Sequence, residues 1–208
     1  MADKMKCVII SGAPENDLDY YSNYIDKAYI ICADSGYVKC RRFGIKPDLI
    51  AGDFDSSDYP DIDCDIIRLN PRKDVTDTFY CVMLAVDKGF REIIILGGIG
   101  SRFDHTYANV LSVNYCFEKN IKCALVNKNN YITILSGENR IEDRGFKYFS
   151  LFPFFEKCDG LSIKNAEYEL DNVTIRPDEQ YSLCNEFKTG KAEIFIKKGK
   201  IILILSND

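Results

Sequence analysis

The chain has 208 residues, of which 46% are hydrophobic, so it can form one large domain or two small ones with a substantial core. Its net charge of −5 and its lack of any long lysine or arginine run argue against a nucleic-acid partner. No apolar run approaches the ~18 residues of a membrane span, and the N-terminal apolar stretch is too short for a signal peptide. We therefore expect a soluble cytoplasmic protein with no membrane partner.

Nine cysteines are scattered along the chain without a C-x-x-C pair. Cys7, Cys32, Cys81 and Cys123 stand inside apolar runs, which is typical of reduced thiols that pack as small hydrophobic side chains. A zinc site is not expected, because paired cysteines are missing and His105 is the only histidine.

The first part of the chain alternates strand-like and helix-like segments. Short apolar runs predict strands over residues 6–12, 28–34, 48–53, 64–70, 91–98 and 122–127. Helical spacing and glycine stops predict helices over residues 35–44, 76–89 and 104–120. Near-continuous apolar strands separated by helices indicate an α/β domain with a mostly parallel sheet and helices on both faces.

The character of the sequence changes at NKNN, residues 127–130. Beyond this point we predict no helix, and short strand-like runs broken by Gly, Asn, Asp and Pro predict an all-β domain, a sandwich. The segment IFIKKGKIILIL predicts a hairpin that turns at Lys198–Gly199. We therefore expect an α/β domain over residues 1–127 and a β-sandwich domain over residues 128–208.

Charged side chains follow the predicted strands of the first domain where each strand ends. In chain order they are Asp34; Asp53 and Asp55; Lys73, Asp74 and Asp77; and Arg102, Asp104 and His105, which follow Gly97 and Gly98. Because ligands of open parallel sheets bind outside the carboxyl ends of the strands, we expect these side chains to share one edge. The opposite edge, around Lys6, Lys27 and Arg91, is expected to carry no comparable cluster.

Such a set of carboxylates favours a bound cation. Two bare carboxylates about 4 Å apart repel by roughly 4 kcal/mol at an effective dielectric of about 20. Oxygen ligands without Cys or His select Mg²⁺, Mn²⁺ or Ca²⁺, and Mg²⁺ commonly combines one or two carboxylates with substrate phosphates. Lys73 and Arg102 suit phosphate oxygens, and the Gly97–Gly100 turn lets the backbone approach a ligand closely. The residues predict a Mg²⁺–phosphoester site, for a nucleotide.

Each feature also has a simpler structural role when taken alone. Asp53–Phe54–Asp55 could be a turn with a helix N-cap. In an extended segment, by contrast, Phe54 would point away from both acids. Asp74 and Asp77 could be first-turn acids favoured by the helix dipole. Arg102 and Asp104 could form a surface ion pair, and His105 could make a structural hydrogen bond at a helix start rather than act as a general base. The joint placement of these residues at one edge is what favours a ligand site.

Four motifs in the first domain carry a family resemblance. ADSG, GIKPDLIAGDFDS, KDVTDTFYCVMLA and ILGGIGSRFDHTYANV strongly resemble, in order and spacing, the motifs of the thiamine pyrophosphokinase family. SLFP, GLSIKNAEYEL and YSLCNEF resemble the family's C-terminal strands, so the resemblance spans essentially the whole chain. It implies transfer of pyrophosphate from ATP to the hydroxyl of thiamine, giving thiamine diphosphate and AMP. It also implies Mg²⁺ as cofactor and a homodimer with active sites between subunits.

The resemblance also implies residue roles. Asp53, Asp55 and Asp77 would hold the metal and the reacting groups, and Asp77 is our first choice to accept or orient the hydroxyl proton. The nucleotide and phosphates would be bound by Asp34, Asp74, Gly97, Gly98, Arg102 and Asp104. Thiamine would be contacted by Ser182 and Asn185, from the partner chain. Three departures from the family pattern are Ser35 for a Gly, Cys184 for a Ser, and the absence of Trp, for which Tyr181 or Phe187 are the aromatic substitutes.

Two other functions compete with this one. A related Mg²⁺-dependent diphosphokinase could act on another heterocyclic alcohol such as a pterin, and the loop Tyr181–Phe187 would discriminate the two substrates. A regulator that binds a nucleotide or thiamine without turnover is disfavoured by the full set of acids, because a pure binder needs fewer buried carboxylates.

Overall fold

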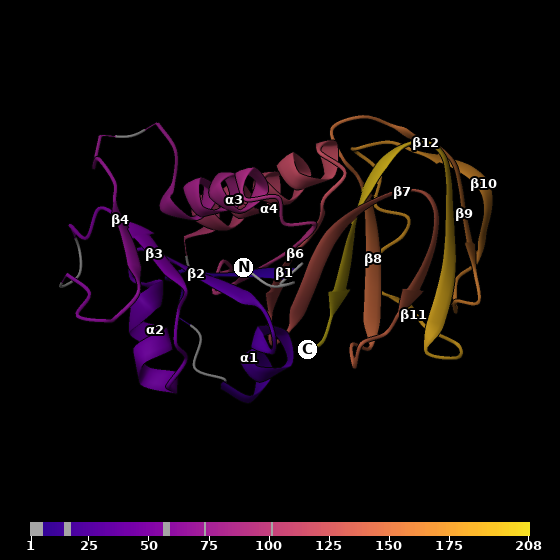
Figure 1. Ribbon diagram of the computed structural model, residues 1–208. Coiled ribbons are helices and arrows are strands. Elements are labelled where there is room, and N and C mark those ends of the chain that lie inside the picture. Colours follow the sequence, from indigo (N-terminus) through magenta and orange to yellow (C-terminus); the bar gives the residue numbers. More distant parts are fainter. Residues whose placement is uncertain (1–5, 15–17, 56–58, 73, 101) are drawn as a thin grey trace. The chain divides into compact units, whose positions relative to one another are not determined.

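The computed structural model describes residues 6–14, 18–55, 59–72, 74–100 and 102–208, without the side chains of residues 18 and 19. The chain divides into two compact units, Met1–Lys128 and Asn129–Asp208 (Figure 1). In the part of the chain that is described, no helix is long and apolar enough to cross a membrane.

Unit 1 alternates strands and helices. Its strands are β1 (Lys6–Ile10), β2 (Tyr29–Ala33), β3 (Leu49–Gly52), β4 (Asp65–Arg68), β5 (Glu92–Leu96) and β6 (Lys122–Asn127). Its helices are α1 (Leu18–Ile25), α2 (Gly36–Phe43), α3 (Asp77–Asp87) and α4 (Phe103–Glu118). Every strand and helix predicted for this part is confirmed with small differences at the ends, and α1 is an additional helix.

The strands of unit 1 form a parallel sheet in the order β6-β5-β1-β2-β3-β4. Helices α3 and α4 cover one face, and α1 and α2 lie on the other (Figure 1). Burial on both faces explains why β1, β2, β3 and β5 are almost wholly apolar and buried. The edge strand β4 instead exposes Asp65 and Arg68, charges that disfavour pairing with another strand. The predicted α/β class is confirmed.

The strand order creates a crevice at one position. From β1 the chain builds outward through β2, β3 and β4, and then returns to the other side of β1 with β5 and β6. The loops after β1 and β5 therefore leave the sheet in opposite directions. In sheets of this kind the ligand site lies at this switch point, at the carboxyl ends of the strands.

Unit 2, all of whose residues are described, is built from antiparallel strands without a helix. They are β7 (Asn130–Glu142), β8 (Tyr148–Pro153), β9 (Cys158–Lys164), β10 (Leu170–Ile175), β11 (Asn185–Glu186) and β12 (Lys191–Ser206). Strand β12 pairs with β7 along its length, with β9 through its first half and with β8 through its second half. Strands β10 and β11 pair with β9 and β8.

The predicted hairpin at Lys198–Gly199 is wrong, because β12 continues through it in one direction. Its pairing with β7 runs from Lys191 opposite Glu142 to Ser206 opposite Asn130, with a register shift between Ile196 and Ile201. Gly199 has φ +100°, which permits a bulge within the strand where the sequence suggested a reversal.

This bulge changes which side chains of β12 face the core. Before it the buried side chains are Ala192, Ile194 and Ile196, and after it they are Ile201, Leu203 and Leu205. All six belong to one hydrophobic cluster with side chains of β8 and β9, including Phe149, Leu151, Leu161 and Ile163. Both halves of one strand therefore close a single core, as expected for the predicted sandwich.

Candidate active site

A cavity of about 330 Å³ lies at the switch point of unit 1, where the exits of β1, β2 and β5 meet the starts of α3 and α4. It is lined by Ser11, Gly12, Ala13, Pro14, Ala33, Asp34, Ser35, Thr76, Asp77, Thr78, Gly97, Gly98, Gly100, Arg102, His105, Thr106 and Asn109. Hydroxyl, carboxylate, guanidinium and backbone groups thus converge on one hollow, the arrangement typical of a site for a polar ligand.

The exits of β1 and β5 are joined by backbone hydrogen bonds. The Ser11 N–H donates to Leu96 O and the Ala13 N–H donates to Gly97 O, each at 2.8 Å. The buried hydroxyls of Ser11 and Thr78 lie 2.7 Å apart and connect the β1 exit to the start of α3. These bonds fix the walls of the cavity before any ligand binds.

Asp34 follows β2 in a left-handed conformation, with φ +45°. Its N–H donates to Ala51 O at 2.8 Å. Gly52 at the end of β3 is required by this arrangement, because a Cβ there would lie 2.7 Å from Asp34 Cα. Among the described residues, Asp34 Oδ1 is buried and has no hydrogen-bond partner. Since buried carboxylate oxygens are normally bonded, this atom is a candidate ligand group.

The start of α3 places Asp77 at the cavity. Thr76 caps the helix, its Oγ1 accepting from Phe79 N–H at 3.1 Å. Asp77 is the first residue of the helix, where the dipole favours a carboxylate. The structural role expected for Asp77 is therefore present, and the same position also makes it part of the cavity wall.

The β5–α4 segment supplies the opposite wall. Asn109 Nδ2 donates to Gly98 O at 2.7 Å and the Gly100 N–H donates to Thr106 Oγ1 at 3.1 Å, so α4 holds the glycine turn in shape. Gly97 has φ +63°, a conformation that favours glycine. Asn109 and Thr106 were not predicted as site residues.

Arg102 and Asp104 form an exposed ion pair at the rim of the cavity. Arg102 Nη2 donates to Asp104 Oδ2 at 2.7 Å and Nε donates to Oδ1 at 3.3 Å. These hydrogen bonds raise the pKa of Arg102 and lower the pKa of the Asp104 carboxyl. The His105 N–H donates to Asp104 Oδ1 at 2.9 Å. The predicted surface pair thus exists, and it orients the guanidinium that lines the cavity.

Asp53 and Asp55 form a turn after β3. The Asp55 N–H donates to Asp53 Oδ1 at 3.3 Å. The expectation that Phe54 lies in an extended segment is wrong, because its φ is +56°. Its ring packs edge-on against Tyr37 and Tyr59, with centroids 6.4 and 5.3 Å away. The aromatic contacts anchor the turn and explain why this unusual conformation is held.

The structure brings together part of the predicted set. Of the described residues, Asp34, Asp77, Gly97, Gly98 and Arg102 line the cavity, while Asp53, Asp55, Asp74 and Asp104 are outside its lining. Lys73 lies outside the described residues. Within the described ranges, no group of three or more Asp, Glu, His and Cys side chains is arranged to hold a metal ion, so the metal role of Asp53, Asp55 and Asp77 stays a prediction.

The residues after β1 are the main ones that sequence reasoning missed. Ser11, Gly12, Ala13 and Pro14 line the cavity although they carry no charge. A search for carboxylates passes over them, because they contribute backbone groups and one hydroxyl. The signal that could have found them is topological, since the first strand of such a sheet borders the switch point.

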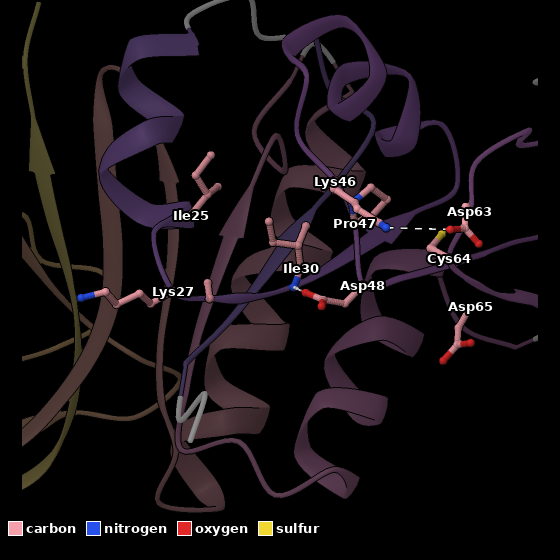
Figure 2. A pocket seen from close by; sticks show the side chains of 10 residues that line it. Ile25, Lys27, Ile30, Lys46, Pro47, Asp48, Asp63, Cys64 and Asp65 are labelled. Atoms are coloured by element: carbon pink, nitrogen blue, oxygen red, sulfur yellow. Dashed lines mark hydrogen bonds and ion pairs between the residues drawn. The ribbon is translucent and has the colours of Figure 1, made fainter. Parts of the chain in front are cut away.

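The opposite edge of the sheet, which was expected to carry no cluster comparable to the candidate site, also carries acidic side chains. A hollow of about 670 Å³ lies there, lined in part by Asp48, Asp63 and Asp65. Figure 2 shows these three side chains. Asp48 Oδ2 accepts from the Ile30 N–H at 2.8 Å, and Lys46 Nζ lies 3.9 Å from Asp63 Oδ2 (Figure 2). Acidic side chains therefore occur at both edges of the sheet. What distinguishes the candidate site from the hollow at the opposite edge is its position at the switch point, not its number of acids.

Ser182 and Asn185 in unit 2 are buried and bonded to the backbone. Ser182 Oγ donates to Leu151 O at 2.6 Å. Asn185 Oδ1 accepts from Tyr168 N–H at 3.0 Å and from Glu186 N–H at 2.9 Å, and its Nδ2 donates to Tyr168 O at 2.8 Å. Ser182 thus connects the loop before β11 to β8, and Asn185 connects β11 to the segment between β9 and β10. A thiamine contact would be an additional role. That contact stays a prediction.

The aromatic candidates near this loop differ in exposure. Phe187 packs against Phe149 at the core, with ring centroids 4.9 Å apart. Tyr181 is 74% exposed and so is the more accessible of the two for stacking on a ligand.

In comparisons with known proteins, segments of both units match domain models of one protein family. Residues 21–125 match the family model "Thiamin pyrophosphokinase, catalytic domain", and residues 138–201 match "Thiamin pyrophosphokinase, vitamin B1 binding domain". Thiamine pyrophosphokinase of Bacillus subtilis is 31% identical, with 96% of this chain and 98% of the relative aligned. Thiamin pyrophosphokinase 1 of Caenorhabditis elegans is 25% identical over 95% of this chain and 86% of its own length.

Solved structures agree with the fold. The crystal structure of the Bacillus subtilis thiamine pyrophosphokinase superposes with a TM-score of 0.88 at 28% identity, over 98% of this chain and 99% of that one. Yeast thiamin pyrophosphokinase has the same fold, with a TM-score of 0.81 at 17% identity over 99% and 87% of the two chains. From the two family models and the Bacillus relative together, the chain belongs to the thiamine pyrophosphokinase family.

Proposed function

We propose that this protein is a thiamine diphosphokinase, an ATP-dependent diphosphotransferase that converts thiamine to thiamine diphosphate and releases AMP. The observation that carries the proposal is the match of one chain to both the catalytic and the vitamin B1 binding models of one family. The alternative of a diphosphokinase for a pterin or another heterocyclic alcohol finds no support in these comparisons. A cavity lined by carboxylate, guanidinium and glycine backbone groups supports nucleotide binding.

The reaction forms one bond and breaks one. The hydroxyl oxygen of thiamine attacks the β-phosphorus of ATP, and the bond from that phosphorus to the α,β-bridging oxygen breaks, so that AMP leaves with that oxygen. The hydroxyl proton passes to a carboxylate, for which Asp77 at the cavity wall is our first choice. Such transfers depend mainly on positioning and on neutralising charge.

The donor atoms present fit Mg²⁺. They are carboxylate oxygens, which a hard cation prefers, and among the described residues Asp34 Oδ1 is a buried carboxylate oxygen of the cavity wall without a hydrogen-bond partner. Asp53, Asp55 and Asp77 would hold the ion together with substrate phosphates. When bound, Mg²⁺ supplies charge neutralisation at the phosphates and polarises the reacting phosphorus. Because no three acidic side chains in the described ranges are arranged to hold a metal ion, phosphate oxygens of the substrate would have to complete the coordination.

Arg102 neutralises phosphate charge in this proposal. A guanidinium has five N–H donors, and the two hydrogen bonds to Asp104 use Nε and one hydrogen of Nη2. The remaining donors are available to phosphate oxygens, in a geometry that Asp104 fixes. Asp74 and the Gly97–Gly98 backbone would complete the contacts to the nucleotide.

A homodimer with shared active sites is part of the proposal. Ser182 and Asn185 of the partner subunit would contact thiamine, as the family resemblance implies. Sedimentation of the full chain should give about twice the mass of one 23.8 kDa chain. Thiamine turnover by a monomeric protein would contradict the proposal that the active site is shared between subunits.

The direct test is incubation of the full chain with ATP, MgCl₂ and thiamine, with AMP and thiamine diphosphate measured together. We expect both products in equal amounts, and none when thiamine is omitted. A parallel reaction with a hydroxymethyl pterin tests the competing substrate. Turnover of the pterin without thiamine turnover would refute the proposal, as would tight ligand binding by calorimetry without either product.

A further inference from the structure

Lys39 of helix α2 reaches the cavity from behind its wall. Its Nζ donates to Ser11 O at 2.6 Å and also to Ala13 O. Both carbonyls belong to residues that line the cavity, while Lys39 itself is outside the lining formed by the described residues. The ammonium group therefore contacts the wall and not the hollow itself.

The loop after β1 is consequently held from two sides. Its Ser11 and Ala13 N–H groups donate to Leu96 and Gly97 at the exit of β5, and its carbonyls accept from Lys39. The exit of strand β5 and helix α2 thus both hold the loop after β1 in place. Removing either set of bonds would leave one side of the loop without its partners.

Gly97, just after β5, also packs against this loop and against Lys39. A Cβ at this residue would lie 2.5 Å from Ser11 O and 2.6 Å from Lys39 Nζ, so the ammonium sits against the glycine turn. Helix α2 can come this close because Gly36 at its start has no side chain, and a Cβ there would collide with Ile10 O. The packing around two glycines therefore places one positive charge beside two walls of the candidate nucleotide site.

We propose that Lys39 is a positioning residue for the nucleotide, which it serves by fixing the β1 loop and by offsetting the carbonyl dipoles that this loop would otherwise present to the phosphates. This inference rests on the proposed function. Charge-assisted hydrogen bonds are stronger than neutral ones, and phosphoryl transfer depends on groups fixed in advance around the developing charge. The Ser11–Thr78 hydroxyl pair would pass a displacement of the loop on to the start of α3, beside Asp77.

The test compares Lys39→Met with Arg41→Met, which removes a positive charge from an exposed position on the same helix. We expect Lys39→Met to raise KM for ATP, and Kd for ATP by calorimetry, about tenfold, the effect of losing roughly one charge-assisted hydrogen bond. KM for thiamine should stay unchanged, and Lys39→Arg should restore most of the ATP affinity. Arg41→Met should behave as the wild type in all three measurements.

Unchanged ATP affinity in a folded Lys39→Met variant would overturn the proposal, and so would equal rises in KM for ATP and thiamine. If Lys39→Met does not fold, Lys39→Gln keeps a donor without the charge and should show the same selective loss; failure of this variant to fold as well would assign Lys39 to folding alone. Should the wild type lack thiamine turnover, the proposed function fails, while the calorimetric comparison with ATP still decides the role of Lys39.

Discussion

Asp34 and Phe54 both take left-handed backbone conformations where neighbouring strands leave the sheet. Their φ angles are +45° and +56°. Asp adopts this region more readily than most residues, whereas for a bulky residue such as Phe54 the conformation is rare and needs surroundings that hold it. Here Gly52 makes room for Asp34, and Tyr37 and Tyr59 hold the Phe54 ring.

The proposed metal role of the Asp53–Asp55 turn gives a first prediction. Asp53→Asn and Asp55→Asn, each made alone, should lower kcat by about 10²-fold or more, because a charged group placed for the transition state is lost. Melting temperature should change little, since the turn is at the surface. Asp61→Asn, an exposed acid in the same segment, is the control. Normal turnover in either variant would contradict the metal role proposed for the residue that was changed.

Asn185 allows the structural and the thiamine role to be separated. Its side chain bonds Tyr168 N–H, Tyr168 O and Glu186 N–H in a buried place. Asn185→Ala should therefore reduce the free energy of unfolding by about 2 kcal/mol or more, because these groups lose their partner. Asn139→Ala, which removes bonds to Ser136 O and Gly137 O in a more open position, should cost less. Urea unfolding of both variants makes the comparison.

The same Asn185→Ala variant reports on the ligand. If Asn185 contacts thiamine, KM for thiamine should rise while KM for ATP stays constant in the fraction that folds. Equal stability of Asn185→Ala and wild type would contradict the structural role, and equal KM for thiamine would contradict the binding role.

At the scale of elements, sequence patterns were most informative in unit 1. Apolar runs and helical spacing predicted its sheet and three of its four described helices, because buried parallel strands carry a continuous signal. The loop KKGK was misassigned because a Gly among lysines has the same composition in a hairpin and in a bulge. Only the pairing of β12 with one partner over its whole length distinguishes them.

The bulge in β12 gives a prediction about Gly199. A Cβ there would lie 2.9 Å from Lys157 O, and the residue has φ +100°. Gly137 has φ +67° with open space around it. Gly137→Ala should therefore lower the free energy of unfolding by only the cost of a left-handed conformation for alanine, roughly 1–2 kcal/mol. Gly199→Ala should lower the free energy of unfolding by an additional ~1–3 kcal/mol, because the new methyl group would collide with Lys157 O. Thermal unfolding of the two variants should rank Gly199→Ala lower, and the reverse order would contradict the bulge.

For the whole molecule, the candidate site could be predicted from the sequence only where charge marked it. Asp34, Asp77 and Arg102 were found because strand-end acids and cations are visible in the sequence. Ser11 and Asn109 were not, because their roles depend on which strands become neighbours, and β1 and β5 are far apart along the chain. The Asp48–Asp65 edge shows the converse, since its acids were overlooked until the sheet placed them together.

The nine cysteines give a prediction for the whole chain. All are free thiols in the structure, seven are buried, Cys64 is half-buried and Cys184 is exposed. Burial raises the pKa of Cys64 and raises that of Cys158 to about 11, which lowers the reactive thiolate fraction at pH 8. A thiol reagent should modify Cys184 first, Cys64 more slowly, and the remaining thiols only after unfolding.

Cys184→Ser should remove the fast phase of this reaction and leave the slower phases unchanged. Rapid modification of three or more thiols in the native protein would contradict the packing described for both units. The expected cytoplasmic location, which the reduced thiols suggested, stays a prediction.

The bulge Lys197–Lys200 has a consequence for how the length of this chain can change. Successive side chains of a strand point to opposite faces, and the bulge moves the inward set from Ala192, Ile194 and Ile196 to Ile201, Leu203 and Leu205. A single-residue insertion or deletion there would turn three apolar side chains outward or force the partner strands to shift. Unit 2 should therefore tolerate substitution of the exposed lysines in this segment far better than any change in their number.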